Sequence, residues 1–378
     1  MRLVFWQNIV SMIDLPYIIG ASKDKRITET IVVSNDINPE RKEMGWDAII
    51  PGIERCKLYV NIDDDTIDEL IRTDPENSFH MFSGLNAYPH VYRPFLMSLK
   101  YPVRRGVTSE RPFTYACGCD WVKPLWMHRL RFWMRNYSIM DKIDTILEIG
   151  KDSSDYYRSL YNKWNVYSFA YCTRENNEMR IESLDPTVLQ VIYVGSLSLR
   201  KSVITLLKAV RVLKEKGYEK NISISIVGDG SERKKLENYI NNNNICNVFF
   251  YGNMKNQEVS KFLVNHDVLV LPSIHDGWGA VINEGLQAGL YSICSDRCGA
   301  KELFTSKDLG TSFKLGNYGQ LAVILENCIK DLNNIRNCCQ KRRDWAKRNI
   351  SGDVIGKYLV DCLLGMEVIA PWKNVHNF

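Results

Sequence analysis

The chain has 378 residues, of which 45% are hydrophobic and 25% are charged, the composition of an ordinary water-soluble globular protein. This length allows two domains, because a single hydrophobic core stops growing near about 250 to 300 residues. The net charge of +5 gives no reason to expect a nucleic-acid partner, and no stretch approaches the roughly 20 apolar residues that a membrane-spanning helix needs.

The 11 cysteines follow no pattern that indicates disulfides or zinc. Apart from the pairs Cys117/Cys119 and Cys338/Cys339 they are scattered singly, whereas disulfide frameworks and zinc sites use repeated spacings. The N-terminal residues 1–10 lack the uninterrupted apolar core and the cleavage site of a signal peptide. We therefore expect a cytoplasmic protein whose chain starts with a strand.

In the first half of the chain, short apolar segments alternate weakly with longer polar or amphipathic ones. Their composition predicts strands at residues 2–6, 30–33, 57–61, 78–82, 103–107 and 145–148. A polar connector, Arg174–Pro186, follows these segments and ends in Asp-Pro. We expect an open α/β domain over residues 1–180.

The second half shows the same alternation more clearly, as is typical of strand–helix units in a parallel sheet. Strands are predicted at residues 188–194, 222–227, 248–251, 268–271 and 291–295, and helices at residues 203–216, 231–241, 256–265 and 281–288. Five parallel strands imply a doubly wound domain over residues 181–354. The last segment, residues 355–378, carries apolar residues that allow it to cross back to the first domain.

The strongest chemical signal is a glycine-containing loop and helix after the fourth of these strands. Residues 272–284 read Pro-Ser-Ile-His-Asp-Gly-Trp-Gly-Ala-Val-Ile-Asn-Glu. In open α/β sheets, ligands bind beyond the carboxyl ends of the strands, where helix N-termini favour anions. We expect a diphosphate over Gly279, Ala280 and Val281, since glycine lets backbone N–H groups approach a phosphate.

Two carboxylates accompany this phosphate loop. Asp276 lies in the loop and Glu284 lies roughly one turn into the helix, so both can face a ligand whose phosphates sit between them. The segment resembles the Glu-x7-Glu motif of the family-4 retaining glycosyltransferases. It departs from that motif in Asp276 for the first Glu, Trp278 for Phe and Gly285 for Ala.

The resemblance extends over residues 188–304. Tyr193–Leu197 with Arg200 and Lys201, Val227–Gly230 with Gly228, Phe250–Asn253 with Gly252, and Ser295–Glu302 all have counterparts in the family. Gly195, Gly228, Gly252 and Asn253 would then line the nucleotide. Ser196 would line it as well, but the family commonly has Arg at this position, so one phosphate contact would be missing here.

The resemblance implies the GT-B fold, two Rossmann-like doubly wound domains that face each other across a cleft. It further implies that Glu284 binds the ribose hydroxyls and Asp276 binds the donor sugar. Arg200 and Lys201 would neutralise the leaving phosphate, so that neither a metal nor another cofactor is needed beside a donor such as a UDP- or GDP-sugar. The alternative for these two cations is that they solvate the start of a helix.

The acceptor would bind to the first domain. We find no convincing pair of carboxylates at a strand end there, and Glu110 is the best candidate for a polar group in the cleft, with structural ion pairing as its alternative. His90 and His128 are lesser candidates. His275, beside the donor motif, could touch the donor or remain a solvated loop residue.

Residues 121–137 interleave tryptophans and other apolar residues with Lys123, Arg129, Arg131 and Arg135. Such a helix can lie on the inner face of an anionic membrane, or it can be a core helix with snorkelling arginines. The first interpretation favours a lipid-linked acceptor, as in bacterial surface-polysaccharide synthesis.

The resemblance thus implies a retaining glycosyltransferase that uses a nucleotide-sugar donor and a glycan or lipid-linked acceptor. Two alternatives remain. A non-hydrolysing nucleotide-sugar epimerase uses the same fold and a similar donor but no acceptor. A catalytically silent nucleotide-sugar-binding protein would keep the site without turnover.

Overall fold

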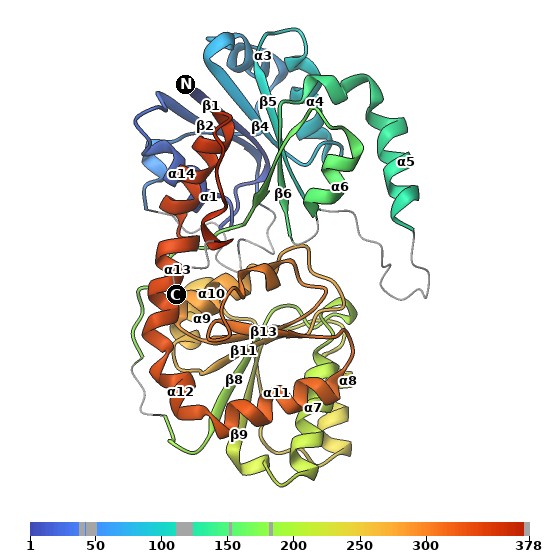
Figure 1. The fold of residues 1–378 in the computed structure, drawn as a ribbon, viewed down its shortest axis with the longest axis vertical. Coiled ribbons are helices and arrows are strands. Elements are labelled where there is room, and N and C mark those ends of the chain that lie inside the picture. Colours follow the sequence, from blue (N-terminus) through green and yellow to red (C-terminus); the bar gives the residue numbers. More distant parts are fainter. Residues whose placement is uncertain (38–41, 43–50, 111–123, 151–152, 181–183, 374–378) are drawn as a thin grey trace. The chain divides into compact units, whose positions relative to one another are not determined.

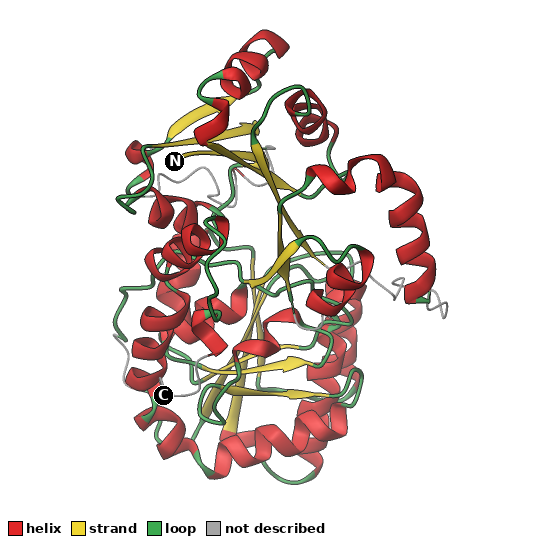
Figure 2. Ribbon diagram, turned by 45° about the horizontal axis from the view of Figure 1, so that its top comes forward, coloured by secondary structure: helices red, strands yellow, loops and turns green. Residues whose placement is uncertain are grey.

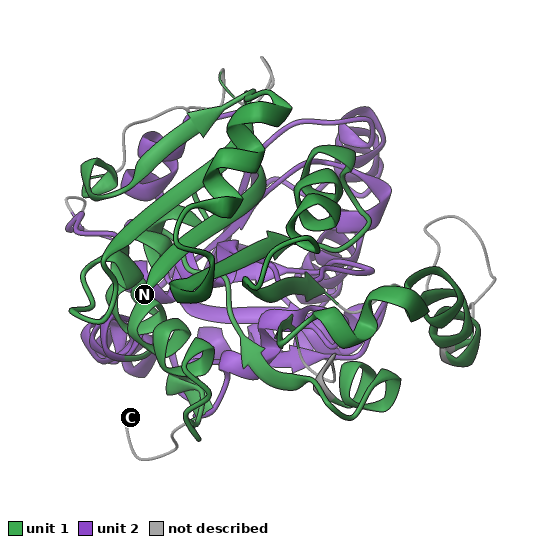
Figure 3. Ribbon diagram, turned by 90° about the horizontal axis from the view of Figure 1, so that it is seen from above, with its two compact units in different colours: residues 1–114, 121–174, 349–374 green, residues 115–120, 175–348, 375–378 purple. Residues whose placement is uncertain are grey.

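The computed structural model describes residues 1–37, 42, 51–110, 124–150, 153–180 and 184–373. These residues form two compact units (Figure 3). The first unit contains the described residues up to Arg174 and those from Asn349 onward, and the second contains those from Glu175 to Arg348. The boundaries predicted from the sequence follow residues 180 and 354.

The first unit is built on a seven-stranded parallel sheet with the strand order β3-β2-β1-β4-β5-β6-β7. Its strands are β1 (Arg2–Ile9), β2 (Glu29–Asn35), β3 (Lys57–Val60), β4 (Ser78–Ser83), β5 (Arg104–Glu110), β6 (Thr145–Ile149) and β7 (Asn165–Phe169). The six predicted strands are all present. The inner strand β1 is almost fully buried from Leu3 to Trp6, as expected of a parallel strand that is covered on both faces.

Helices cover both faces of this sheet (Figures 1 and 2). They are α1 (Leu15–Ser22), α3 (Asp64–Arg72), α4 (Pro89–Ser98), α5 (Leu125–Asn136), α6 (Ser153–Leu160) and α14 (Gly352–Leu363), with short 3-10 segments at Ile53–Arg55, Pro75–Asn77, Tyr137–Lys142 and Pro371–Lys373. Helix α3 begins where Asp63 accepts a hydrogen bond from the backbone N–H of Thr66, at 2.9 Å.

The C-terminal helix α14 returns to the first unit and packs on α1. A side chain at Gly20 would lie 2.1 Å from the carbonyl oxygen of Gly352, and one at Gly356 would lie 2.3 Å from the backbone nitrogen of Ala21. Glycine is therefore required where the two helices touch backbone to backbone. Further along the chain, Trp372 is buried in the same unit.

The second unit contains a six-stranded parallel sheet with the order β10-β9-β8-β11-β12-β13. Its strands are β8 (Leu189–Val194), β9 (Ile222–Val227), β10 (Val248–Gly252), β11 (Val268–Leu271), β12 (Tyr291–Ser295) and β13 (Gly310–Phe313). The predicted count of five strands was wrong by one, because β13 is short and contains Gly, Thr and Ser instead of a β-branched apolar run.

The helices of the second unit connect these strands or follow them. They are α7 (Val203–Glu215), α8 (Arg233–Asn242), α9 (Asn256–Leu263), α10 (Val281–Ala288), α11 (Tyr318–Lys330), α12 (Leu332–Asn337) and α13 (Cys339–Ile350), with 3-10 segments at Leu199–Lys201, Glu219–Asn221 and Gly299–Leu303. Helix α13 leads the chain back toward the first unit. The predicted fold class, two doubly wound α/β domains, is confirmed.

Each sheet has one point at which the strand order reverses, between β1 and β4 in the first unit and between β8 and β11 in the second. At such a point the connecting loops diverge to opposite faces of the sheet and leave a crevice at the carboxyl ends of the strands. The two reversal points therefore indicate where a ligand would bind in each unit.

Candidate functional site

In the second unit, two loops meet at the reversal point of the sheet. One leaves β8 and contains Arg200, and the other leaves β11 and contains Ile274 and His275. The backbone N–H of Ile274 donates to the carbonyl oxygen of Arg200 at 2.8 Å, and the Arg200 guanidinium donates to the carbonyl oxygen of His275 at 2.9 Å. The predicted phosphate-binding cations are thus fixed to the loop that carries the predicted sugar-binding carboxylate.

An ion pair joins the two loops at their centre. Lys201 Nζ lies 2.6 Å from Asp276 Oδ2, and the two side chains are only 15% and 13% exposed. Arg200 Nη1 lies 3.7 Å from the same carboxylate oxygen but is 43% exposed. Two cations and one carboxylate therefore share this crevice, and Arg200 is the cation with more access to solvent.

Glycines bring the neighbouring loops into direct contact. A side chain at Gly228 would lie 2.0 Å from the carbonyl oxygen of Gly195. The Gly228 N–H donates to the carbonyl oxygen of Gly252 at 2.7 Å, and the Gly195 N–H donates to that of Val227 at 3.0 Å. These three predicted nucleotide-binding glycines thus serve to pack the ends of β8, β9 and β10 together, whatever they bind.

The same loops contain three polar residues, Ser196, Asp229 and Asn253, that differ in their hydrogen bonds and exposure. The carbonyl oxygen of Ser196 accepts a hydrogen bond from the Tyr193 hydroxyl at 2.8 Å, and Asn253 is exposed. Asp229 accepts from the Gly230 N–H at 2.7 Å and pairs with Arg233 at 2.8 Å. Asp229 is therefore the turn residue that its Gly-Asp-Gly context suggests.

The predicted phosphate-binding loop is held in place by contacts of Trp278 and Gly279 with the core. Gly279 has a φ of +92°, and a side chain there would lie 2.6 Å from Cys298 Sγ and 2.8 Å from Leu271. Trp278 is buried, and its indole N–H donates to Asn283 Oδ1 at 2.8 Å. Both residues hold the loop against the core, so Trp278 is not a surface on which a base could stack.

Helix α10 begins directly after this loop, with Ala280 at its N-cap position. The backbone N–H groups of Gly279, Ala280 and Val281 come too early in the helix to have intrahelical acceptors. The helix dipole adds partial positive charge at the same end. This helix start, beside Arg200 and Lys201, has the properties of an anion-binding site.

Glu284 lies in the first turn of α10 and is half-buried. Burial raises the pKa of its carboxyl group from 4.5 to about 7, because removal of water disfavours the charged form. Near neutral pH this group can therefore bind or release a proton. A ligand that offers hydroxyl donors would favour its charged form.

In the first unit, the carboxyl group of Glu110 affects the pKa of a second carboxyl group, that of Asp14, which was not predicted from the sequence. Burial raises the pKa of the Asp14 carboxyl, just before α1, to about 7, and the negative charge of Glu110, at the carboxyl end of β5, acts in the same direction. Tyr17 donates to Asp14 at 3.1 Å, and Tyr171 forms a hydrogen bond with the side chain of Glu110. The search of the sequence for a pair of carboxylates at a strand end named Glu110 but not Asp14.

The parallel sheet explains why these residues share one edge, because Asp14 and Tyr171 follow β1 and β7 and Glu110 ends β5. The loops are also tied directly, since the Cys172 N–H donates to the carbonyl oxygen of Ile13 at 3.3 Å. The only sequence signal for Asp14 is its place shortly after the first strand. Nothing in the local pattern indicates its partner.

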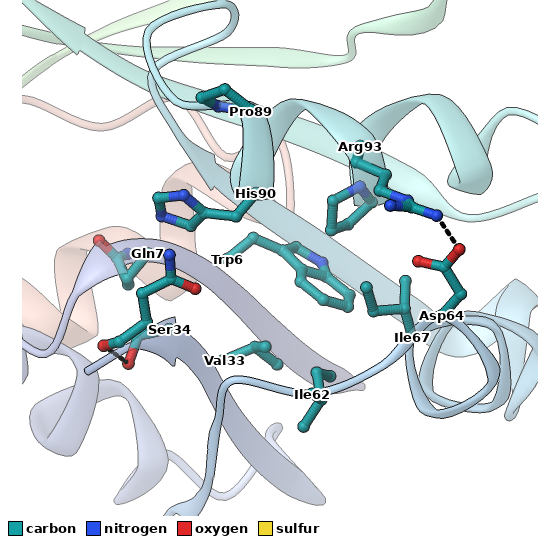
Figure 4. Close-up of a pocket in the computed structure, with 12 residues that line it drawn as sticks. Trp6, Gln7, Val33, Ser34, Ile62, Asp64, Ile67, Pro89, His90 and Arg93 are labelled. Atoms are coloured by element: carbon teal, nitrogen blue, oxygen red, sulfur yellow. Dashed lines mark hydrogen bonds and ion pairs between the residues drawn. The ribbon is translucent and has the colours of Figure 1, made fainter.

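A cavity of about 310 Å³ lies at the reversal point of the first sheet, a volume in the range of small-ligand pockets. It is lined by Trp6, Gln7, Val33, Ser34, Asn35, Ile62, Asp64, Ile67, Pro89, His90, Arg93 and Pro94. Figure 4 shows the ion pair between Arg93 and Asp64 beside it. His90 Nε2 lies 3.1 Å from the carbonyl oxygen of Asn8. Of the two lesser histidine candidates, His90 therefore lines a pocket, whereas His128 lies on α5.

Comparison with known proteins gives one family and several relatives. Residues 175–350 match the family model of Glycosyl transferases group 1. The uncharacterized glycosyltransferase MJ1178 of Methanocaldococcus jannaschii is 30% identical over 95 residues, 25% of this chain and 25% of that protein. The 2-deoxystreptamine N-acetyl-D-glucosaminyltransferase of Niallia circulans is 24% identical over 280 residues, 70% of this chain and 68% of that protein.

Among solved structures, that of Anabaena Alr3699/HepE in complex with UDP and glucose aligns over 97% of this chain and 100% of its own, with a TM-score of 0.68 and 13% identity. A likeness at this identity shows the fold alone. Together with the family match, which covers the second unit, it supports a glycosyltransferase with the GT-B fold.

Proposed function

We propose that this chain is a retaining glycosyltransferase that moves a sugar from a nucleotide donor, such as a UDP- or GDP-sugar, to a hydroxyl of a glycan or lipid-linked saccharide. The observation that carries this proposal is the pair of loops joined by Lys201 and Asp276 beside the N-terminus of α10. The Alr3699/HepE structure with UDP and glucose supports the class of donor. The proposed acceptor is a glycan or lipid-linked saccharide of bacterial surface-polysaccharide synthesis, at the cytoplasmic face of a membrane.

The donor diphosphate would bind at the start of α10. There the N–H groups of Gly279 to Val281 and the helix dipole attract it, and Arg200 adds a cation that is already exposed. Glu284 would accept hydrogen bonds from the ribose hydroxyls. The loops at Gly228, Gly252 and Asn253 would lie along the nucleoside.

The ion pair between Lys201 and Asp276 would change its partners when the donor binds. The diphosphate would draw Lys201 Nζ away from the carboxylate. Asp276 would then accept hydrogen bonds from the donor sugar. In this arrangement Lys201 and Arg200 supply the positive charge that the leaving phosphate needs, and the proposed reaction uses no metal.

In the proposed reaction, the bond between the anomeric carbon and the leaving phosphate oxygen breaks while the acceptor oxygen bonds to the same face of that carbon. The proton of the acceptor hydroxyl passes to the leaving phosphate. Retention thus needs no enzyme nucleophile. The residues of the second unit hold the donor and stabilise the developing charge.

The acceptor would bind to the first unit. Asp14 and Glu110 offer carboxylate oxygens to sugar hydroxyls at the carboxyl ends of β1 and β5. The cavity lined by Gln7 and His90 offers further polar groups. Both lie at the edge of the sheet where α/β proteins bind ligands.

Incubation of the purified protein with UDP- and GDP-sugars tests the proposal. Release of nucleotide should depend on an acceptor, and NMR of the product should show the anomeric configuration of the donor. Conversion of the donor sugar without any acceptor would indicate an epimerase. Binding of nucleotide without release across the panel would indicate a silent binding protein, and either result would overturn the proposal.

A further inference from the structure

Helix α5 exposes a group of large apolar side chains. The exposed fraction lies between 45% and 67% for each of six side chains, those of Trp126, Met127, Leu130, Trp133, Met134 and Tyr137. The other tryptophans in the described part of the chain are buried, namely Trp6, Trp164, Trp278, Trp345 and Trp372. Apolar side chains that are exposed singly are ordinary, but a contiguous group marks a binding surface.

These six side chains form one stripe along the helix. Successive residues of an α-helix are rotated by about 100°, so Trp126, Leu130, Trp133 and Tyr137 stay within an arc of roughly 60°. The rings of Trp133 and Tyr137 are 4.9 Å apart. Met127 and Met134 widen the arc to roughly 120°. We call these six residues the apolar stripe.

The opposite side of α5 attaches the helix to the first unit. Phe132 packs edge-on against Tyr157 and Trp164, with ring centroids 6.5 Å and 6.1 Å apart. Asn136 is buried and accepts a hydrogen bond from Asn86 Nδ2 at 2.6 Å. One side of α5 is thus fixed, and the apolar stripe has no cover within the described residues, as the position of α5 at the margin of its unit shows (Figure 1).

Cations border the stripe on both sides. Viewed down the helix axis, Arg131 and Arg135 lie beyond the two methionines on one side of the stripe and are exposed. Arg129 lies on the other side, next to Trp133, and is half-buried. Residues 121–140 contain no Asp or Glu. Lys123, which the sequence adds to this group, lies outside the described residues. An apolar stripe between arginines is complementary to a surface with an apolar interior and a negatively charged rim.

We propose that α5 lies in the interface of an anionic membrane, with the apolar stripe inserted among the lipids and Arg131 and Arg135 at their phosphates. Trp and Tyr prefer this level of a bilayer, and arginine side chains reach along an apolar surface to place their charge in the headgroups. Helices of this pattern lie in the membrane plane. A second copy of the chain and a protein groove are the competing occupants.

The inference rests on the proposed function, because it assigns the acceptor to the lipid-linked class. Helix α5 belongs to the crossover that starts at Glu110, the carboxyl end of β5. A membrane bound by α5 is therefore held by the same unit that carries the proposed acceptor residues Asp14 and Glu110. The enzyme would meet an acceptor that diffuses in two dimensions.

Co-sedimentation with vesicles tests the membrane contact. The wild-type protein should bind vesicles of phosphatidylglycerol and phosphatidylcholine in equal parts, and bind more weakly to phosphatidylcholine alone. Because each cation near an anionic surface contributes about fivefold to binding, the double variant Arg131→Gln/Arg135→Gln should bind about 25-fold more weakly. High salt should weaken wild-type binding in the same direction.

A second variant, Trp126→Ser/Trp133→Ser, separates insertion from charge attraction. It should lose about tenfold or more in vesicle binding at any salt concentration, since burial of two indole rings is removed. Matched controls on the same unit are Arg72→Gln/Lys100→Gln, which removes two exposed cations, and Ile369→Ser, which removes an exposed apolar side chain. The controls should bind vesicles like the wild type.

Three outcomes would overturn the inference: no binding of the wild type to anionic vesicles, equal losses in the control variants, or a lipid-free dimer that Trp126→Ser/Trp133→Ser dissociates. The substituted side chains of α5 are exposed, so these variants should fold. Nucleotide binding, measured on the same samples, reports separately on the proposed function. Loss of nucleotide binding with intact vesicle binding would count against the proposed donor site and not against the membrane contact.

Discussion

The carboxyl group of Glu284 lies half-buried in the first turn of α10, where burial raises its pKa from 4.5 to about 7. A raised pKa means that the folded protein holds this proton more tightly than the unfolded chain does. The group contributes nothing to the pH dependence of stability below about pH 4.5. Between pH 4.5 and about 7 its ionisation increasingly destabilises the unliganded protein.

The size of this destabilisation follows from the difference between the two pKa values. One pH unit corresponds to about 1.4 kcal/mol, so the cost of ionised Glu284 approaches roughly 3 kcal/mol above pH 7. Glu284→Gln keeps the shape but cannot ionise. We expect this variant to be more stable than the wild type at pH 8, by up to roughly 3 kcal/mol, and equally stable at pH 4.

The same substitution should weaken donor binding, because ribose hydroxyls donate to a carboxylate. The ionised fraction of a group with a pKa of about 7 rises about tenfold between pH 6 and pH 8. Nucleotide affinity of the wild type should therefore rise with pH over this range, by about tenfold more than that of Glu284→Gln. The variant controls for titration of the nucleotide's own phosphates.

Urea denaturation at pH 4 and pH 8 measures the stability, and isothermal titration of UDP and GDP between pH 6 and pH 8 measures the affinity. Parallel pH profiles of nucleotide binding in wild type and variant would refute the role of Glu284 as a ribose acceptor. Equal stability at pH 8 would refute the raised pKa. A variant that is more stable but binds less would show that the site is kept at the expense of stability.

Asp276→Ala should lower turnover more than nucleotide affinity, because the carboxylate is proposed to bind the sugar after Lys201 has turned to the phosphate. An equal loss of turnover and nucleotide affinity, seen in steady-state kinetics, would contradict this. Gly228→Ala should destabilise the fold by about 2 kcal/mol or more, because the new side chain would overlap a carbonyl oxygen. The control Gly319→Ala, in the open first turn of α11, should not destabilise it. Thermal melting compares the two variants. Glu110→Gln should raise the KM for the acceptor and leave donor binding unchanged, and a changed donor affinity would remove Glu110 from the acceptor site.

Sequence patterns alone determined much of the fold. Apolar runs marked eleven of the strands, and the inner strands among them are apolar along their length because both of their faces are buried. The pattern did not reveal β7 and β13, which read Asn-Val-Tyr-Ser-Phe and Gly-Thr-Ser-Phe and are less apolar. Tertiary pairing, not composition, makes them strands.

Local spacing also brought together the elements of the candidate donor site. Asp276 and Glu284 are eight residues apart on one loop and helix, so their geometry follows from the chain itself. Their connection to Lys201, 75 positions earlier, depends on β8 and β11 being neighbours. The family pattern predicted that these residues share a site, but only the fold shows that Lys201 and Asp276 form an ion pair.

The grouping of Asp14 with Glu110 and the exposure of α5 were decided by tertiary structure. Asp14 and Glu110 are 96 positions apart, and their loops lie at one edge of the sheet because the intervening strands pair in parallel. A sequence cannot tell a core helix from an interfacial one when both are amphipathic. On α5 only the surrounding structure shows that Phe132 faces the protein while Trp126 and Trp133 face outward, because burial is a property of neighbours and not of the helix.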